Sequence, residues 1–157
     1  MQKNDVAPVL HREFMELALV QALLAGEAGE VPVGAVLVRE GEVVASDHNR
    51  RDESGDPTAH AEALVLRQAG TDTGDWRLEG TTLYITLEPC AMCAGAIVLA
   101  RVRTVVFGAS DPAAGAGGSA YNILEDGKLG HRVEAIAGVM ENECRALLET
   151  FFGDKRP

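Results

Sequence analysis

The stretch that decides the fold is residues 81–109, TTLYITLEPCAMCAGAIVLARVRTVVFGA. Its first seven residues are rich in β-branched and aromatic side chains, and they predict a strand over residues 81–87. Residues 90–100 are small and apolar and predict a helix, while residues 104–107 predict another strand. Because parallel strands need a long crossover connection, this strand–helix–strand order predicts two parallel neighbours.

The flanking sequence continues the alternation of strands and helices. Further elements are expected at residues 11–25 (helix), 33–38 and 43–45 (a hairpin of two largely buried strands), 59–69 (helix capped by Thr58), 132–136 (strand) and 139–152 (helix), with loops over 46–58 and 111–121. Together they predict an α/β fold, a three-layer α/β/α sandwich around one mixed five-stranded sheet. With 157 residues, we expect a single domain over residues 1–157.

Composition sets limits on the function. The chain has 14 Lys and Arg against 24 Asp and Glu, a formal net charge of −10, and an aromatic content of only 4%. Charge alone therefore does not suggest a nucleic-acid-binding protein. A hydrophobic content of 46% excludes a disordered acidic chain.

Three cysteines are too few, and of the wrong parity, for a framework of disulfides. Reduced thiols or a metal site are the expected alternatives. The N-terminal residues contain no apolar run that resembles a signal peptide, and no stretch approaches the roughly 20 apolar residues that span a bilayer. The expected compartment is the cytoplasm, with no membrane partner.

Two short motifs open consecutive predicted helices. The first is His60-Ala-Glu62, and the second is Pro89-Cys90-Ala-Met-Cys93. Cysteines three positions apart point to one side of a helix, so one ion can reach both sulfurs. The partial positive charge at a helix N-terminus lowers thiol pKa values and favours the thiolates that bind a soft metal.

His60 and Glu62 can face one site only at the opening turn of a helix, where the preceding loop still bends. One imidazole and two thiolates form a set of three ligands, and tetrahedral zinc with three protein ligands keeps a fourth position for water. A carboxylate beside that water can accept and return protons. The motifs therefore predict a catalytic zinc site with Glu62 as the proton carrier.

The alternative is a non-catalytic zinc-binding module whose site is closed by a fourth protein ligand. The remaining candidates are His11, His48, His131 and Cys144. Cys144 falls in the apolar pattern of the last helix and is expected in the core, since free cysteine behaves as a small hydrophobic residue. A closed site also leaves Glu62 without a role.

The two motifs match the H-x-E…P-C-x-x-C signature of zinc-dependent nucleobase deaminases. The chain resembles the cytidine deaminase superfamily and, more closely, the bacterial tRNA-specific adenosine deaminases. The resemblance covers most of residues 10–153 and includes VPVGAVLV (31–38), DPTAHAE (56–62), LYITLEPCAMCAG (83–95), VFGA (106–109) and HRVE (131–134).

The resemblance implies hydrolytic conversion of adenosine to inosine at the wobble position of a tRNA anticodon stem-loop. It implies one Zn²⁺ per subunit held by His60, Cys90 and Cys93, with Glu62 moving protons between water, the ring nitrogen N1 and the departing ammonia. The resemblance also implies four substrate contacts: Val33 below the base, Asn49 beside it, Asp111 at the neighbouring sugar and Phe152 as an aromatic clamp. It further implies that the protein is a homodimer.

The chain departs from the family where the family often carries basic residues. The loop after Asp111 reads Pro-Ala-Ala-Gly and contains no basic residue. Because contacts with phosphates supply much of the affinity for RNA, we expect a chain with a net charge of −10 to gather its cations at the mouth of the site. The candidates are Arg50, Arg51, Arg67, Arg77, Lys128, Arg132, Lys155 and Arg156. The acidic balance keeps a second function open, a deaminase of a free nucleobase or nucleoside such as guanine, cytosine or cytidine.

Overall fold

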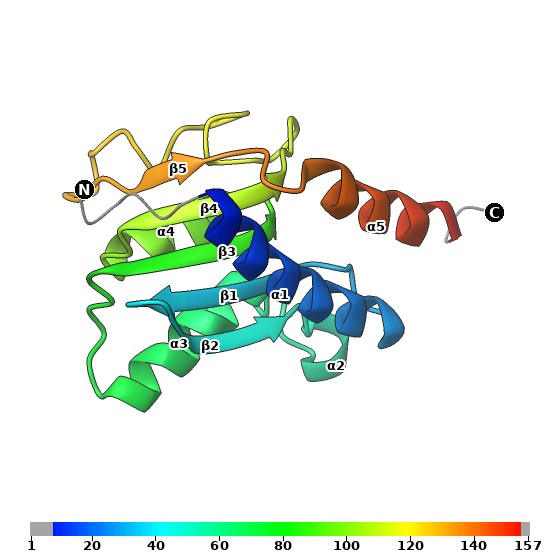
Figure 1. Ribbon diagram of the computed structural model, residues 1–157, viewed down its shortest axis with the longest axis horizontal. Coiled ribbons are helices and arrows are strands. Elements are labelled where there is room, and N and C mark those ends of the chain that lie inside the picture. The colour runs from blue at the N-terminus through cyan, green and yellow to red at the C-terminus, as the bar shows by residue number, and fades with distance from the viewer. Residues whose placement is uncertain (1–7, 155–157) are drawn as a thin grey trace.

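A mixed five-stranded sheet in the order β2-β1-β3-β4-β5 runs through the computed structural model, which describes residues 8–154 (Figure 1). The strands are β1 (Gly34–Arg39), β2 (Glu42–His48), β3 (Thr81–Leu87), β4 (Thr104–Ala109) and β5 (Glu134–Ile136). β1 pairs antiparallel with β2 and β3, whereas β3, β4 and β5 are parallel. The predicted parallel pair and the mixed sheet are confirmed.

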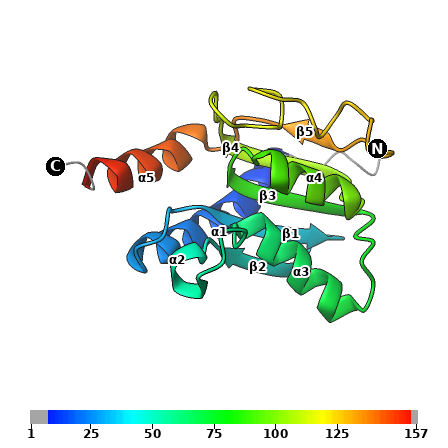
Figure 2. The same cartoon turned by 180° about the vertical axis from the view of Figure 1, so that it is seen from behind.

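Helices cover both faces of this sheet. Helices α1 (Pro8–Glu27) and α5 (Glu141–Asp154) lie on one face, and α3 (Ala61–Thr73) and α4 (Ala91–Leu99) lie on the other, as Figures 1 and 2 show from opposite sides. This is the three-layer sandwich that the sequence predicts.

The alternation of side chains along the strands explains why the sheet needs both layers. On β1, Ala35 and Leu37 belong to the core shared with α3 and α4, whereas Val36 and Val38 belong to the core shared with α1 and α5. Successive residues of a strand point to opposite faces, so a central strand in such a sandwich is apolar throughout. The uninterrupted apolar runs in the sequence have this cause.

The prediction that both hairpin strands are largely buried is wrong for β2. Only Ala45 and His48 of this strand are buried, and Val43 is exposed. β2 lies at the edge of the sheet, where it has one neighbouring strand. An apolar pair such as Val43-Val44 does not distinguish an edge strand from a central one.

The predicted loop over residues 46–58 also contains more regular structure than expected. β2 extends to His48, and a short helix α2 (Arg51–Ser54) follows it. The buried carboxylate of Glu30 accepts hydrogen bonds from the backbone N–H groups of Asp52 (3.1 Å) and Glu53 (2.8 Å). These amides have no partner within the helix, so a residue 22 positions earlier stabilises α2 and local sequence cannot predict it.

Helix α1 approaches the start of β1 unusually closely at Gly34. A Cβ atom there would lie 2.1 Å from the carbonyl oxygen of Ala18 and 2.6 Å from the nitrogen of Ala22. Only glycine allows this approach. It places α1 over the end of the sheet at which α3 and α4 begin, on the opposite face. Within residues 8–154, no helix is both long and apolar enough to cross a membrane.

Candidate active site

The site lies where α3 and α4 begin. His60 is the N-cap residue of α3 and Cys90 that of α4, and both have extended backbones. Neither side chain caps its own helix, so both are free to point into the space between the two helices. The predicted cap Thr58 is wrong, because α3 begins at Ala61 with His60 as its N-cap residue. The Thr58 hydroxyl donates to the carboxylate of Asp56 (2.7 Å).

Three donor atoms meet in this space. His60 Nδ1 lies 3.7 Å from Cys90 Sγ and 3.4 Å from Cys93 Sγ, and all three atoms lie within 4.8 Å of one another. Bond lengths of about 2.0–2.1 Å to nitrogen and 2.3 Å to sulfur put such donors about 3.6 Å apart around tetrahedral zinc. The geometry therefore fits a zinc ion.

The charges of the three donors depend on one another. Hydrogen bonds from the Cys93 thiol and from His60 lower the pKa of Cys90 to about 3, so its sulfur is a thiolate. The same contact with Cys90, together with burial, raises the pKa of Cys93, and the hydrogen bond to Cys90 raises the pKa of His60. A bound cation would take the place of these protons, since metals bind thiolate and neutral imidazole.

The Glu62 carboxyl group lies beside these donors, one residue into α3 from its first position. It is only 4% exposed, and this burial raises its pKa above the usual range. A carboxyl group whose pKa is raised toward neutrality both accepts and donates protons efficiently.

A cavity of about 240 Å³ opens onto this cluster. Among the residues that sequence analysis singled out for the site, Val33, Asn49, His60, Glu62, Cys90 and Asp111 line it. Its other lining residues are Val31, Arg51, Leu87, Glu88 and Ala114. The cavity is smaller than the 300–1,000 Å³ typical for drug-sized ligands, which suits a single small ring system.

Comparisons with known proteins agree with this geometry. Residues 8–109 match the model of the cytidine and deoxycytidylate deaminase zinc-binding region. The chain is 50% identical to the tRNA-specific adenosine deaminase of Bacillus subtilis over 143 residues, which cover 91% of this chain and 89% of that protein. The chain belongs to the bacterial tRNA-specific adenosine deaminase family.

Two solved structures place this family member among its relatives. One comes from a study of A-to-I editing by tRNA:A34 deaminases at the wobble position; it is 48% identical, with a TM-score of 0.84 over 87% of this chain and 99% of that chain. The other is a guanine deaminase from Bacillus subtilis, 39% identical, with a TM-score of 0.61 over 64% of each chain.

In this deaminase, Asn49 has a structural task as well as a place in the cavity. Its Oδ1 accepts a hydrogen bond from the N–H of Ala61 (2.8 Å), and its Nδ2 donates to the carbonyl of Val31 (3.1 Å). The side chain thus ties the end of β2 to the first turn of α3, beside His60. Sequence analysis did not predict these two hydrogen bonds.

Asp111 also lines the cavity, from a loop that is held by Glu88, a residue that sequence analysis missed. Its Oδ1 accepts hydrogen bonds from the backbone N–H groups of Ala113 (3.1 Å) and Ala114 (3.2 Å), which form a turn. The loop also donates to the buried carboxylate of Glu88. Burial raises the pKa of Glu88, but its hydrogen bonds from Ser119, Asp111 and Gly117 outweigh this and lower it. The only signal in the sequence is an acidic residue directly after an apolar strand.

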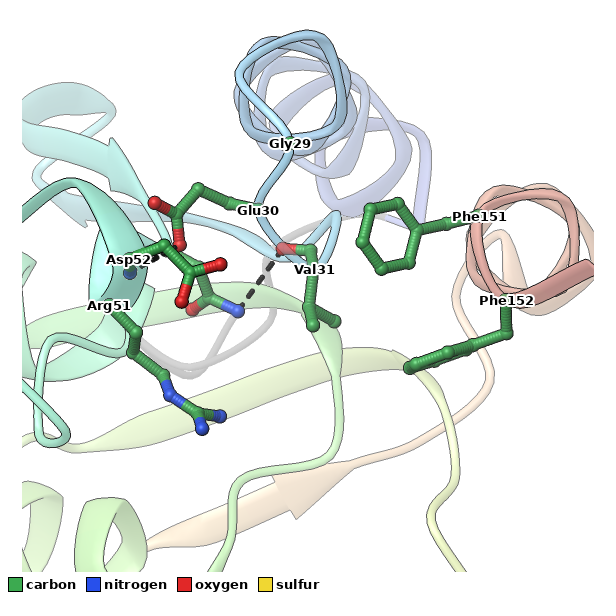
Figure 3. Close-up of a pocket in the computed structure, with 8 residues that line it drawn as sticks. Gly29, Glu30, Val31, Arg51, Asp52, Phe151 and Phe152 are labelled. Carbon is green, nitrogen blue, oxygen red and sulfur yellow. Dashed lines mark hydrogen bonds between the residues drawn. The ribbon is translucent and has the colours of Figure 1, made fainter. Parts of the chain in front are cut away.

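Phe152 lies outside the catalytic cavity, in a neighbouring one of about 300 Å³ (Figure 3). This outer cavity shares Val31, Asn49 and Arg51 with the catalytic cavity. In Figure 3, Phe151 and Phe152 project from α5 on one side of Val31, and Arg51 lies on the other. The two rings pack edge to face, with their centroids 5.4 Å apart.

The candidates for a fourth zinc ligand all lie elsewhere. His11 Nδ1 hydrogen-bonds to the Tyr84 hydroxyl (2.8 Å), His48 Nδ1 to the Asn49 carbonyl (2.9 Å), and His131 Nε2 to the Val102 carbonyl (2.8 Å), while Cys144 packs in the core with α1. Among residues 8–154, the group suited to a metal is His60, Cys90 and Cys93. The described chain therefore offers no closed four-ligand site.

The expected gathering of cations at the mouth is not observed. Arg51 is the only arginine or lysine that lines either cavity within residues 8–154. Arg50 pairs with Asp47 (2.8 Å) and Glu53 (2.9 Å), and Arg77 pairs with Asp75 (3.3 Å). Lys155 and Arg156 lie outside the described residues.

Proposed function

We propose that this chain hydrolyses adenosine to inosine at the wobble position of a tRNA anticodon stem-loop. The observation that carries this function is one small cavity that brings together Glu62, His60 and Cys90, in a chain 50% identical to a tRNA-specific adenosine deaminase. The reaction adds water at C6 of the base and releases ammonia. It therefore needs an oxygen nucleophile and a proton carrier at one place.

His60, Cys90 and Cys93 would hold one Zn²⁺ per subunit through Nδ1 and the two Sγ atoms. Three protein ligands would leave a fourth coordination position for water. When bound, zinc lowers the pKa of water at an open position from 15.7 to about 7 and so supplies hydroxide at neutral pH.

Glu62 moves the protons. Its carboxylate takes one proton from the attacking water and gives it to N1 of the adenine ring. It then takes the proton of the new hydroxyl group at C6 and transfers it to the amino group, so that the C6–N bond breaks, ammonia leaves and the C6 carbonyl of inosine forms. The burial of Glu62 excludes bulk water that would otherwise compete for these protons.

The cavity walls hold a base that has left the stack of the anticodon loop. Val33 offers an apolar contact, and Asn49 retains one amide hydrogen for the base, because Nδ2 carries two and Val31 accepts one. Both hydrogen bonds to Asp111 reach Oδ1, which leaves Oδ2 for a ribose hydroxyl. Phe152 in the outer cavity offers a stacking face for the neighbouring nucleotide.

Two copies of this single-domain protein pair through α4 in the proposed cytoplasmic enzyme. The helix has no charged residue, and it presents Met92 and Leu99 to solvent, 42% and 58% exposed. Between them lie Gly95, which has no side chain, and Ala96, which has only a methyl group, so another helix can approach closely. An exposed apolar helix face of this kind is typical of a protein interface.

The test of this function is direct. A tRNA with adenosine at the wobble position, incubated with the protein, should gain inosine at that position only. Glu62→Ala should abolish the conversion while the zinc content, measured by mass spectrometry, stays at the wild-type level. If a folded, zinc-loaded wild-type protein leaves the adenosine of this tRNA unmodified, the proposal is contradicted.

A free-base deaminase is the second candidate, because a single cation lines the two cavities and because a guanine deaminase shares the fold. Release of ammonia from guanine, cytosine or cytidine, without conversion of tRNA, would favour it. A non-catalytic zinc module predicts a fourth protein ligand, and the absorption spectrum of a cobalt-substituted sample would reveal one.

A further inference from the structure

Glu88 is a buried carboxylate that takes no part in the proposed chemistry. It follows the last residue of β3 and precedes Cys90 by two positions, and it is 2% exposed. The carboxylate lines the catalytic cavity without belonging to the group suited to a metal. A buried carboxylate needs partners, because removing it from water is costly.

Its partners all come from one loop, residues 111–119. Oε1 accepts hydrogen bonds from the N–H of Asp111 (2.9 Å) and the hydroxyl of Ser119 (2.5 Å). Oε2 accepts hydrogen bonds from the N–H groups of Gly117 (2.9 Å) and Ser119 (3.0 Å). Both ends of an irregular loop are therefore bound to one side chain.

The loop is also packed directly against this carboxylate. A Cβ atom at Gly115 would lie 2.3 Å from Cδ of Glu88 and 2.5 Å from the carbonyl of Asp111. The N–H of Ala116 donates to the carbonyl of Pro89 (2.8 Å), between Glu88 and Cys90. Glu88 thus joins the loop to the chain segment that enters the zinc-binding helix.

This loop forms one wall of the catalytic cavity through Asp111 and Ala114. We infer that Glu88 is a positioning residue, which holds the 111–119 loop in place so that this wall is formed before the substrate enters. The inference rests on the proposed function for the identity of the substrate. Ordering the wall in advance removes the entropy that binding would otherwise lose.

The contact pattern requires a glutamate. A carboxylate offers about four lone-pair sites, which match the four donors. Glutamine keeps the size but turns an NH₂ group toward two of those donors, and aspartate is one methylene shorter.

Glu88→Gln is the variant that tests the positioning role. KM for an anticodon stem-loop should rise about 10- to 100-fold while kcat changes less than about threefold and bound zinc stays at the wild-type level. Hydrogen exchange at the amides of residues 111, 117 and 119 should speed up in the free protein. Ser119→Ala, which removes one donor, should give a smaller rise in KM if Glu88→Gln does not fold.

Glu125→Gln is the matched control, because Glu125 also accepts a backbone hydrogen bond, from Ala135 (3.1 Å), but lines a separate groove. It should leave KM unchanged. Wild-type KM or unchanged exchange in Glu88→Gln overturns the inference. If the wild-type protein acts on a free base and not on tRNA, the proposed function fails, and the same comparison with that base still decides the role of Glu88.

Discussion

His60 Nδ1 lies 3.4 Å from Cys93 Sγ, although the two residues are 33 positions apart and belong to different helices. The contact arises because β3 lies between α3 and α4 in the sequence, and its C-terminal end lies at the end of the sheet where both helices begin. The fold therefore brings the three donors together through its backbone.

Removing one donor should empty the site. In Cys93→Ala, two donors remain, and we expect zinc affinity to fall by more than about 100-fold, since even loss of a residue that only supports a ligand costs 10- to 100-fold. Zinc per chain and deaminase activity should fall together. Cys144→Ala, which removes a buried cysteine from the other layer, should keep its zinc. Stoichiometric zinc in purified Cys93→Ala would contradict the assignment of this ligand.

Asn49→Ala should lower both stability and activity. It leaves the N–H of Ala61 and the carbonyl of Val31 without their partner, and we expect a loss of about 2–4 kcal/mol in the free energy of unfolding. Urea unfolding measures this loss. Asn122→Ala, which removes an exposed hydrogen bond to the N–H of Glu125 (3.2 Å), should cost less than about 1 kcal/mol. Equal losses in the two variants would show that Asn49 is not a structural tie.

The pH dependence of stability should include Tyr84. Burial raises the pKa of Tyr84 from 10.0 to about 12, so the folded state holds this proton more tightly than the unfolded state. The contribution is fully present below pH 10 and is lost as the pH rises through 12, by about 3 kcal/mol in total. The unfolding free energy of wild type minus that of Tyr84→Phe should therefore fall as the pH rises through this range. A difference between wild type and Tyr84→Phe that does not change between pH 9 and 12 would contradict this prediction.

Leu99→Glu should separate the subunits of the proposed dimer. A charge on the apolar face of α4 would be buried without a partner in a helix–helix interface, which costs several kcal/mol. Sedimentation velocity should show a dimer for wild type and a monomer for Leu99→Glu. Leu23→Glu, which places the same charge on an exposed position of α1, should remain a dimer. A monomeric wild-type protein would contradict the proposed dimer, and a monomer only in Leu23→Glu would place the interface away from α4.

Local sequence predicted the elements whose patterns arise from their immediate surroundings. The strand–helix–strand order of residues 81–109 led to the parallel pair β3 and β4, because both strands carry apolar residues on both faces and lie between two helical layers. The prediction of a buried second hairpin strand was wrong, since Val43 lies on an edge strand. The cap predicted at Thr58 was wrong because the helix begins at Ala61, two positions later than predicted, with His60 as its N-cap residue.

The sequence by itself determined the fold class, the family and the donor set of His60, Cys90 and Cys93, because each depends on residue types at short, regular spacing. Only the tertiary structure decided what surrounds that set: the second cavity at Phe152, the loop bound to Glu88 and, among residues 8–154, Arg51 as the one cation that lines either cavity. Those features depend on hydrogen bonds and packing between residues about 20 to 120 positions apart, which no local pattern records.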